Sequence, residues 1–205
     1  MADNTQKVVE FRGCDNLVFA EVTKDENGSG GYVTGEVEQL APIAEISKTV
    51  ESSSEAKYYD NRAMLTVNSE GADEITLTVP ALPIKKIGKI LGKTVDTDTG
   101  ALLDGAREEK YFALGYRTKL TDGTYRYVWR LKGSFSIPDE KSTTENNGTD
   151  SNNQELKYTG ISTTHEFTKG GSVKGVVVDE RDGLADVSTF FDEVTTPDTL
   201  QKKTI

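Results

Sequence analysis

Apolar and polar residues alternate through most of the chain, which is typical of β-strands that bury one face. Between residues 74 and 79, for example, Ile75, Leu77 and Val79 fall on one face and threonines on the other. Strands of this kind are expected at 8–12, 16–22, 32–40, 43–49, 63–68, 74–79, 111–119, 124–137, 156–168 and 173–180. The pattern therefore predicts a mainly β protein.

Turn-forming segments separate two pairs of these strands, which predicts β-hairpins. The first hairpin joins 63–68 to 74–79 across the sequence SEGAD, and the second joins 111–119 to 124–137 across TDG. A small ribbon is expected at 94–104, around its own DTG sequence.

One segment, 82–91, has helical periodicity instead. Its lysines fall on one side of the expected helix, and the other side carries Ile84, Ile87, Ile90 and Leu91. Gly92 stands where a left-handed C-terminal cap is expected. We predict a single amphipathic helix that ends at Leu91.

The segment 48–61, KTVESSSEAKYYDN, is a long polar stretch between two expected strands. Hairpin loops usually contain about two to five residues, and much longer loops are usually disordered or functional. The adjacent Tyr58 and Tyr59 favour contact with a partner over free solvation. We predict a long loop that serves as an assembly arm, with the candidate residues Glu51, Ser52, Ser53, Ser54, Glu55, Ala56, Lys57, Tyr58, Tyr59 and Asp60.

Two other segments differ from the strand pattern. The segment 138–155 is polar and has almost no apolar side chains, so it is predicted to be a mobile loop. The segment 195–205 is predicted to be a flexible tail, and 185–191 a short helix or turn anchored by Phe190 and Phe191. The whole chain, 1–205, is expected to form one domain.

Composition narrows the possible functions. Of the 205 residues, 35% are hydrophobic and 28% charged, which is lean for a globular enzyme but normal for thin β-layers. The net charge of -10 disfavours attractive binding to phosphate backbones. Cys14 is the single cysteine, so no disulfide can form within the chain. No segment resembles a signal peptide or a membrane span, and the chain is predicted to be soluble, with no membrane partner.

Candidate catalytic and metal-binding groups are few. His165 is the single histidine, and strand geometry would scatter the neighbouring Ser162, Thr163 and Glu166 over both faces. Zinc sites need clusters of cysteine and histidine, which the sequence lacks. We therefore expect no enzyme activity, no metal and no cofactor. Arg126 and Arg130, on one face of an expected strand, are expected to meet carboxylates of the same or a neighbouring subunit.

Running sequence resembles a known family over about residues 7–199. The stretches that carry the resemblance are KVVEFRGCDNLVFAEVT, ISKTVESSSEAKYYDNRAMLTVNSEGADEITLTV, YRYVWRLKGSFSIPDE and VVVDERDGLADVSTFFD. They are similar to the major tail proteins, or tail tube proteins, of long-tailed phages of Gram-positive bacteria. Because no catalytic signature is involved, the resemblance indicates the family and not the roles of individual residues.

The resemblance implies a β-sandwich or half-barrel with one flanking α-helix. It further implies a structural virion protein that forms hexameric rings, which stack into a tube through which DNA passes along an acidic lumen. The 48–61 segment matches the family's inter-ring loop, and Phe190 and Phe191 are assigned to a C-terminal assembly arm. The implied partners are further copies of the chain, the tape measure protein, the tail terminator and the baseplate or distal tail proteins. Assembly would take place in the host cytoplasm.

One alternative belongs to another functional class. A monomeric β-sandwich binding module could present surface aromatics to a carbohydrate or protein ligand, using Tyr58, Tyr59, Tyr125, Tyr127 and Trp129. Aromatic residues on strands are more often part of a core than of a binding platform. Rings or tubes of the concentrated protein would support the tail protein, and a persistent monomer that binds glycans would support the binding module.

Overall fold

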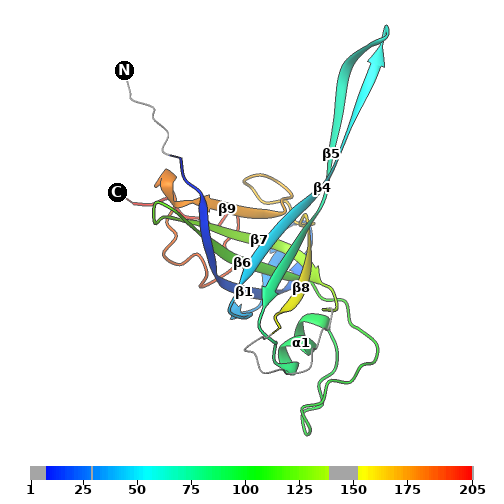
Figure 1. Cartoon of the computed structure of the whole chain (residues 1–205), viewed down its shortest axis with the longest axis vertical. Coiled ribbons are helices and arrows are strands. Elements are labelled where there is room, and N and C mark those ends of the chain that lie inside the picture. The colour runs from blue at the N-terminus through cyan, green and yellow to red at the C-terminus, as the bar shows by residue number, and fades with distance from the viewer. Residues whose placement is uncertain (1–7, 29, 139–151, 205) are drawn as a thin grey trace, which may run out of the picture.

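The computed structural model describes residues 8–28, 30–138 and 152–204 as one curled antiparallel sheet with a single α-helix among them (Figure 1). The strands are β1 (Phe11–Asp25), β2 (Tyr32–Thr34), β3 (Glu38–Gln39), β4 (Glu45–Tyr59), β5 (Arg62–Val79), β6 (Phe112–Leu120), β7 (Tyr125–Phe135), β8 (Gln154–Ile161) and β9 (Gly175–Asp179). The helix is α1 (Ile84–Leu91), and a 3-10 turn, η1 (Glu180–Asp182), follows β9. The expectation of a mainly β half-barrel with one flanking helix is confirmed.

The strand order explains how the sheet curls. The order is β2-β1-β6-β7-β8-β5-β4, while β3 pairs with β1 and β9 with β7. Along the free side of β7, Arg126–Arg130 pairs with β9 and Lys132–Phe135 pairs with β8. The sheet therefore branches at β7, where β8 and β9 share one side of the strand, and the curled sheet forms only part of a barrel.

Both faces of the sheet are buried. The first core lies inside the curl and includes α1, and its largest fully buried side chains are Phe19, Phe112, Phe135, Tyr158, Leu77 and Leu114. The second core lies on the opposite face under the C-terminal segment, around Tyr127, Trp129, Leu131, Phe190 and Val194. Alternation along β7 explains the division, because Val128 points into the first core while its neighbours Tyr127 and Trp129 point into the second.

The predicted helix and the predicted β6–β7 hairpin are both confirmed. In α1, Ile90 and Leu91 are buried in the first core, and Gly92 ends the helix in the left-handed conformation with φ 62°. The amide of Lys93 donates to the carbonyl of Gly88 at 2.9 Å, which satisfies one of the last free helix carbonyls. A Cβ at Gly92 would lie 2.0 Å from the carbonyl oxygen of Glu108, so only glycine fits there. No helix in the described ranges has the length and apolar character needed to cross a membrane.

The predicted loop at 48–61 is wrong. Residues up to Tyr59 continue β4, and β5 runs unbroken from Arg62 to Val79, so the hairpin expected between 63–68 and 74–79 is also wrong. The two strands pair with each other over nearly their whole length. The outer part of β4 buries neither face, so it carries no apolar alternation that would have marked it as a strand, whereas 63–68 on β5 was expected to be one.

Two further expectations concern the polar segments. Residues 139–151 of the predicted mobile loop lie outside the described residues, and β8 begins at Gln154. The flexible tail at 195–205 is wrong for the part that the structure describes, because Thr196 is buried and Lys202 forms a bridge to Ala185. The Asp198 carboxylate also accepts hydrogen bonds from the amides of Thr168 and Lys169 at 2.9 and 3.0 Å. Polar side chains here make specific contacts that composition does not reveal.

Candidate assembly surface

The outer parts of β4 and β5 leave the body as a two-stranded ribbon, which we call the arm and define as residues 51–71 (Figure 1). Figure 1 shows it projecting away from α1 and from the rest of the sheet. The region that the sequence assigned to an assembly loop is therefore an assembly candidate of a different kind, a β-hairpin.

The arm ends in a two-residue turn at Asp60 and Asn61. Their φ angles are 47° and 61°, which is the left-handed pair that a type I′ turn requires, and Tyr59 pairs with Arg62 across it. Asparagine and aspartate adopt this conformation more readily than other non-glycine residues. The Asp-Asn pair was thus the sequence signal for a hairpin.

Pairing between side chains supports the arm along its length. Ser53 and Ser69 are opposite each other and share a hydrogen bond of 2.7 Å, and Lys57 contacts Glu55 at 2.7 Å. The register shifts at two points, between Val50 and Ser52 and between Lys57 and Tyr58. Such bulges bend and twist a ribbon locally, so one lies at the root of the arm and one beside its tip.

Apolar side chains gather near the tip and are solvent-exposed in the single chain. Tyr58 and Tyr59 are 70% and 58% exposed, and Met64, Leu65 and Val67 on the returning strand are exposed as well. Exposed apolar clusters of this kind mark interaction sites on soluble proteins. The two tyrosines could be recognised from the sequence, whereas Met64, Leu65 and Val67 could not, because only the pairing of β4 with β5 brings them to the same end of the ribbon.

A buried carboxylate holds the root of the arm to the body. The Asp73 carboxylate on β5 is almost fully buried. It forms ion pairs with the Arg130 guanidinium at 3.0 Å and with the Lys48 and Lys174 ammonium groups at 3.3 Å each. Lys174 also donates to the carbonyl of Gly71. The β4, β5 and β7 strands and the segment before β9 therefore meet at one buried charge at the root of the arm.

The expectation for the two arginines on β7 is confirmed within the chain. Arg130 binds Asp73, and the Arg126 guanidinium lies 2.9 Å from the Asp179 carboxylate. Asp179 also accepts hydrogen bonds from Arg181, and these two cations hold the pKa of its carboxyl well below the usual range. These arginines are thus committed to structural ion pairs.

Phe190 and Phe191 lie in the second core, not beside the arm. Phe190 is 2% exposed, its ring lies 5.5 Å from that of Tyr127, and its carbonyl accepts a hydrogen bond of 2.8 Å from the Trp129 indole. Phe191 packs on Trp129 at 5.8 Å. Their assignment to an assembly arm stays a prediction, and their contacts in the single chain are those of core residues.

We expect Phe190→Ala to destabilise the folded chain by about 3–5 kcal/mol, because it removes a buried ring and leaves a cavity against Tyr127. Thermal or urea unfolding of the soluble chain measures this effect. Leu184→Ala is the matched control, since Leu184 is exposed and nearby in sequence. A Phe190→Ala chain of normal stability that failed to assemble would instead support the arm assignment.

His165, the single histidine and a candidate catalytic group, makes structural contacts. The amide of His165 donates to Asp25 at 2.8 Å, its ring Nδ1 lies 3.2 Å from the carbonyl oxygen of Glu26, and its ring packs edge-on against Phe167. Within the described ranges, no group of three or more histidine, cysteine or acidic side chains could hold a metal ion.

The aromatic platform of the alternative hypothesis does not form. Trp129 is fully buried, Tyr127 is nearly so, and both belong to the second core. Tyr58 and Tyr59 lie at the tip of the arm, on different strands from this core. Of the five proposed residues, Tyr58 and Tyr59 at the arm tip are the exposed ones.

One family model and two solved structures are similar to this chain. A family model described as "Phage tail tube protein" matches residues 44–178. Among solved structures, a chain of the sheath-tube complex of an extracellular contractile injection system in its extended state has a TM-score of 0.40 and 11% identity, covering 80% of this chain and 88% of that one. The tube-terminating cap of the anti-feeding prophage has a TM-score of 0.38 and 10% identity, covering 87% and 99%. No curated protein matches the sequence.

Proposed function

Because the chain belongs to the phage tail tube protein family, we propose that it forms hexameric rings that stack into the tail tube through which phage DNA passes. The family consists of structural proteins of the virion tail, so the chain is a structural protein and not an enzyme. The observation that carries the finer proposal is the arm, a two-stranded ribbon whose apolar tip is exposed in the single chain.

Ring formation would use the edges of the sheet. The sheet ends at β4 on one side and at β2 and β3 on the other, and an edge strand is a template for pairing with another chain. Joining six sheets edge to edge into one barrel would remove these free edges. Such a ring is a closed heterologous assembly, in which different surfaces of neighbouring copies meet.

Stacking would use the arm. In this proposal residues Glu51–Asp60 and the paired part of β5 tie one ring to the next. Stacking is open-ended, so its length must be set by other proteins, and the tape measure protein, the tail terminator and the baseplate or distal tail proteins are the proposed partners. The running-sequence resemblance supports a long-tailed phage of Gram-positive bacteria, with assembly in the host cytoplasm.

Passage of DNA would depend on charge. Duplex DNA carries about one negative charge per 1.7 Å of its axis, so an acidic lumen would repel it and prevent adhesion. The net charge of -10 supports this proposal. A lumen face with more cations than carboxylates in an assembled tube would contradict it.

Negative-stain electron microscopy of the concentrated, purified chain tests the proposed assembly. We expect rings with six-fold end views and tubes that lengthen as protein concentration rises, because stacking follows mass action. The same preparation at low concentration is the control. A chain that stays monomeric when concentrated and binds glycans would overturn the proposal and favour the binding module.

A further inference from the structure

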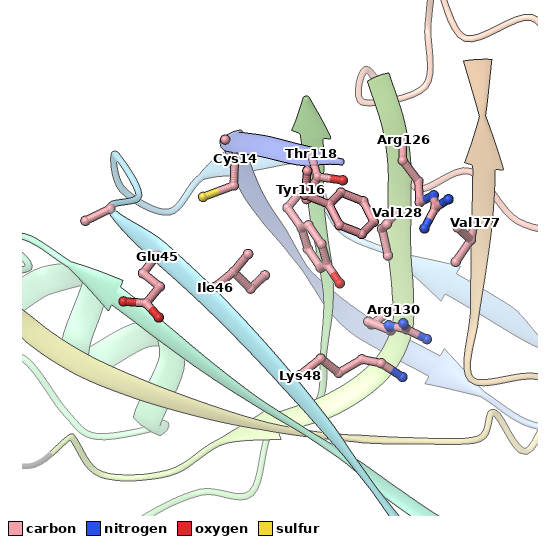
Figure 2. A pocket seen from close by; sticks show the side chains of 13 residues that line it. Cys14, Glu45, Ile46, Lys48, Tyr116, Thr118, Arg126, Val128, Arg130 and Val177 are labelled. Carbon is pink, nitrogen blue, oxygen red and sulfur yellow. The ribbon is translucent and has the colours of Figure 1, made fainter. Parts of the chain in front are cut away.

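A cavity of about 600 Å³ opens on the inside of the half-barrel, and we call it the trough (Figure 2). Figure 2 shows Ile46 and Lys48 of β4 on one side, facing Tyr116 of β6 and Val128 of β7 on the other. The strands β6, β7, β8 and β5 separate β1 from β4 in the sheet, yet both β1 and β4 line the trough. No residue of α1 lines it, so α1 fills the inside of the curl elsewhere and leaves this part open.

Two polar atoms in the trough have no partner. The Thr118 hydroxyl and Nε of Arg130 are buried and form no hydrogen bond with the described part of the chain. Both residues line the trough. Buried polar groups are nearly always hydrogen-bonded, to protein or to ordered water. Because both atoms are buried in the single chain, an oxygen of an occupant could reach them only if side chains of the trough lining move.

The rim of the trough has features of a contact site. Phe11 and Val177 line it and are largely exposed, and the Arg126 guanidinium lies 5.0 Å from the centre of the Phe11 ring. Its cationic lining residues are already paired within the chain, Lys48 and Arg130 with Asp73 and Arg126 with Asp179. The trough therefore suits an occupant with apolar side chains.

We propose that the trough receives the arm tip of a second copy of this chain, a proposal that rests on the proposed stacking function. The tip offers Tyr58, Tyr59 and Met64 as exposed apolar groups, and the Asp60 carboxylate with the turn carbonyls as acceptors. Aromatic side chains bury about 150–250 Å² each, and the trough volume lies within the range of about 300–1,000 Å³ that is usual for binding pockets. The apolar arm tip of one copy thus matches the trough of another copy in chemistry and size.

The arm cannot reach the trough of its own chain. Lys48 lines the trough and Tyr58 lies ten residues further along the same strand, which at about 3.3 Å per residue places the tip about 33 Å away. Figure 1 shows the arm leading away from the body. The contact must therefore join two copies, and one copy can accept a tip while giving its own to the next.

Crosslinking through Cys14 tests the proposal directly, because Cys14 lines the trough and is the only cysteine in the chain. Burial and the neighbouring Asp15 raise the pKa of its thiol, so a short bismaleimide at mildly alkaline pH is the suitable reagent. In the Arg62→Cys variant, which keeps all the proposed docking groups and places the thiol beside the turn opposite Tyr59, we expect crosslinked dimers and longer ladders on denaturing gels. The wild-type chain and the variant Arg62→Cys with Cys14→Ser are the controls, and neither should give the ladder. Leu184→Cys, exposed on the body, should not give it either.

Each outcome decides between this proposal and the proposed function. Tubes of the Arg62→Cys variant without crosslinks would overturn the trough contact and leave the tail tube intact. Crosslinked dimers in concentrated protein without tubes would support the contact and overturn the ring assembly. A crosslink confined to single chains would overturn the second-copy occupant. So would a rise in Cys14 reactivity after deletion of residues 2–7, which would identify the N-terminal segment as the occupant.

Discussion

Shortening the arm is expected to abolish tube formation without unfolding the chain. In the shortened variant, residues 54–68 are replaced by Asn-Gly, so that Ser53 and Ser69 flank a two-residue type I′ turn. The removed residues lie almost wholly in solvent, so the stability of the body should change by no more than about 0.5 kcal/mol. Electron microscopy of concentrated protein measures assembly, and urea unfolding measures stability.

A milder variant separates the contribution of the arm tip to stacking from that of the rest of the arm, which we call the shaft. Tyr58→Ser with Tyr59→Ser keeps the Asp60–Asn61 turn but removes the aromatic groups, and it should yield rings or short tubes only. Asn68→Ser is the matched control, because Asn68 is an exposed polar residue of the shaft, and its tubes should be normal. Long tubes from the shortened variant would contradict a stacking role for the arm.

Replacing Asp73 by alanine is expected to be the most destabilising change at the root of the arm, by about 3–5 kcal/mol. The substitution removes the one carboxylate that Lys48, Arg130 and Lys174 share, and it leaves the largely buried Arg130 without a counter-charge. Breaking a buried ion pair from one side costs far more than the pair contributes to stability, because the remaining charge cannot be hydrated. Equilibrium unfolding in urea gives the free-energy difference.

Glu70 supplies the control for this prediction. Its side chain is 77% exposed and lies 3.8 Å from the Lys174 ammonium, so it is a surface partner of the same cation. Glu70→Ala should change the free energy of unfolding by less than about 1 kcal/mol. If both substitutions had equally small effects, the root of the arm would be held by strand pairing alone.

The root of the arm is attached to the body at two places, and this attachment lowers the entropic cost of docking. An isolated two-stranded hairpin is marginally stable in water, yet this arm continues strands whose inner parts, from Ile75 to Val79, are buried in the first core. The shared Asp73 contact adds a second attachment. A ribbon held in one direction loses less conformational entropy on docking than a free loop would. The structure thus favours the arm over a disordered segment as a stacking element.

Several elements could be read from the sequence because local physics decides them. The period of Ile84, Ile87, Ile90 and Leu91 and the stop at Gly92 give α1 within two residues of its ends. The β6–β7 hairpin follows from alternation on both sides of a TDG turn. In each case large apolar side chains recur at the period of the element, so the pattern of side chains reports it.

The arm escaped prediction for the opposite reason. Its strands bury neither face, and the signal for its turn, Asp60–Asn61, is weaker than the usual Asn-Gly or Asp-Gly. The C-terminal segment was misread as well, because the contacts that order it, such as Asp198 with the amides of Thr168 and Lys169, join residues about thirty positions apart. Neither feature leaves a periodic trace.

The sequence by itself determined the strand-rich class, the single helix, the lack of catalytic and metal-binding clusters, the acidic charge and the resemblance to tail tube proteins. All of these depend on residue type and local spacing. Tertiary structure decided the arm, the placement of Phe190 in the core, the shared charge at Asp73 and the trough beside Cys14. These features arise where distant segments meet, and the free energy of such contacts depends on burial and pairing that exist only after the chain has folded.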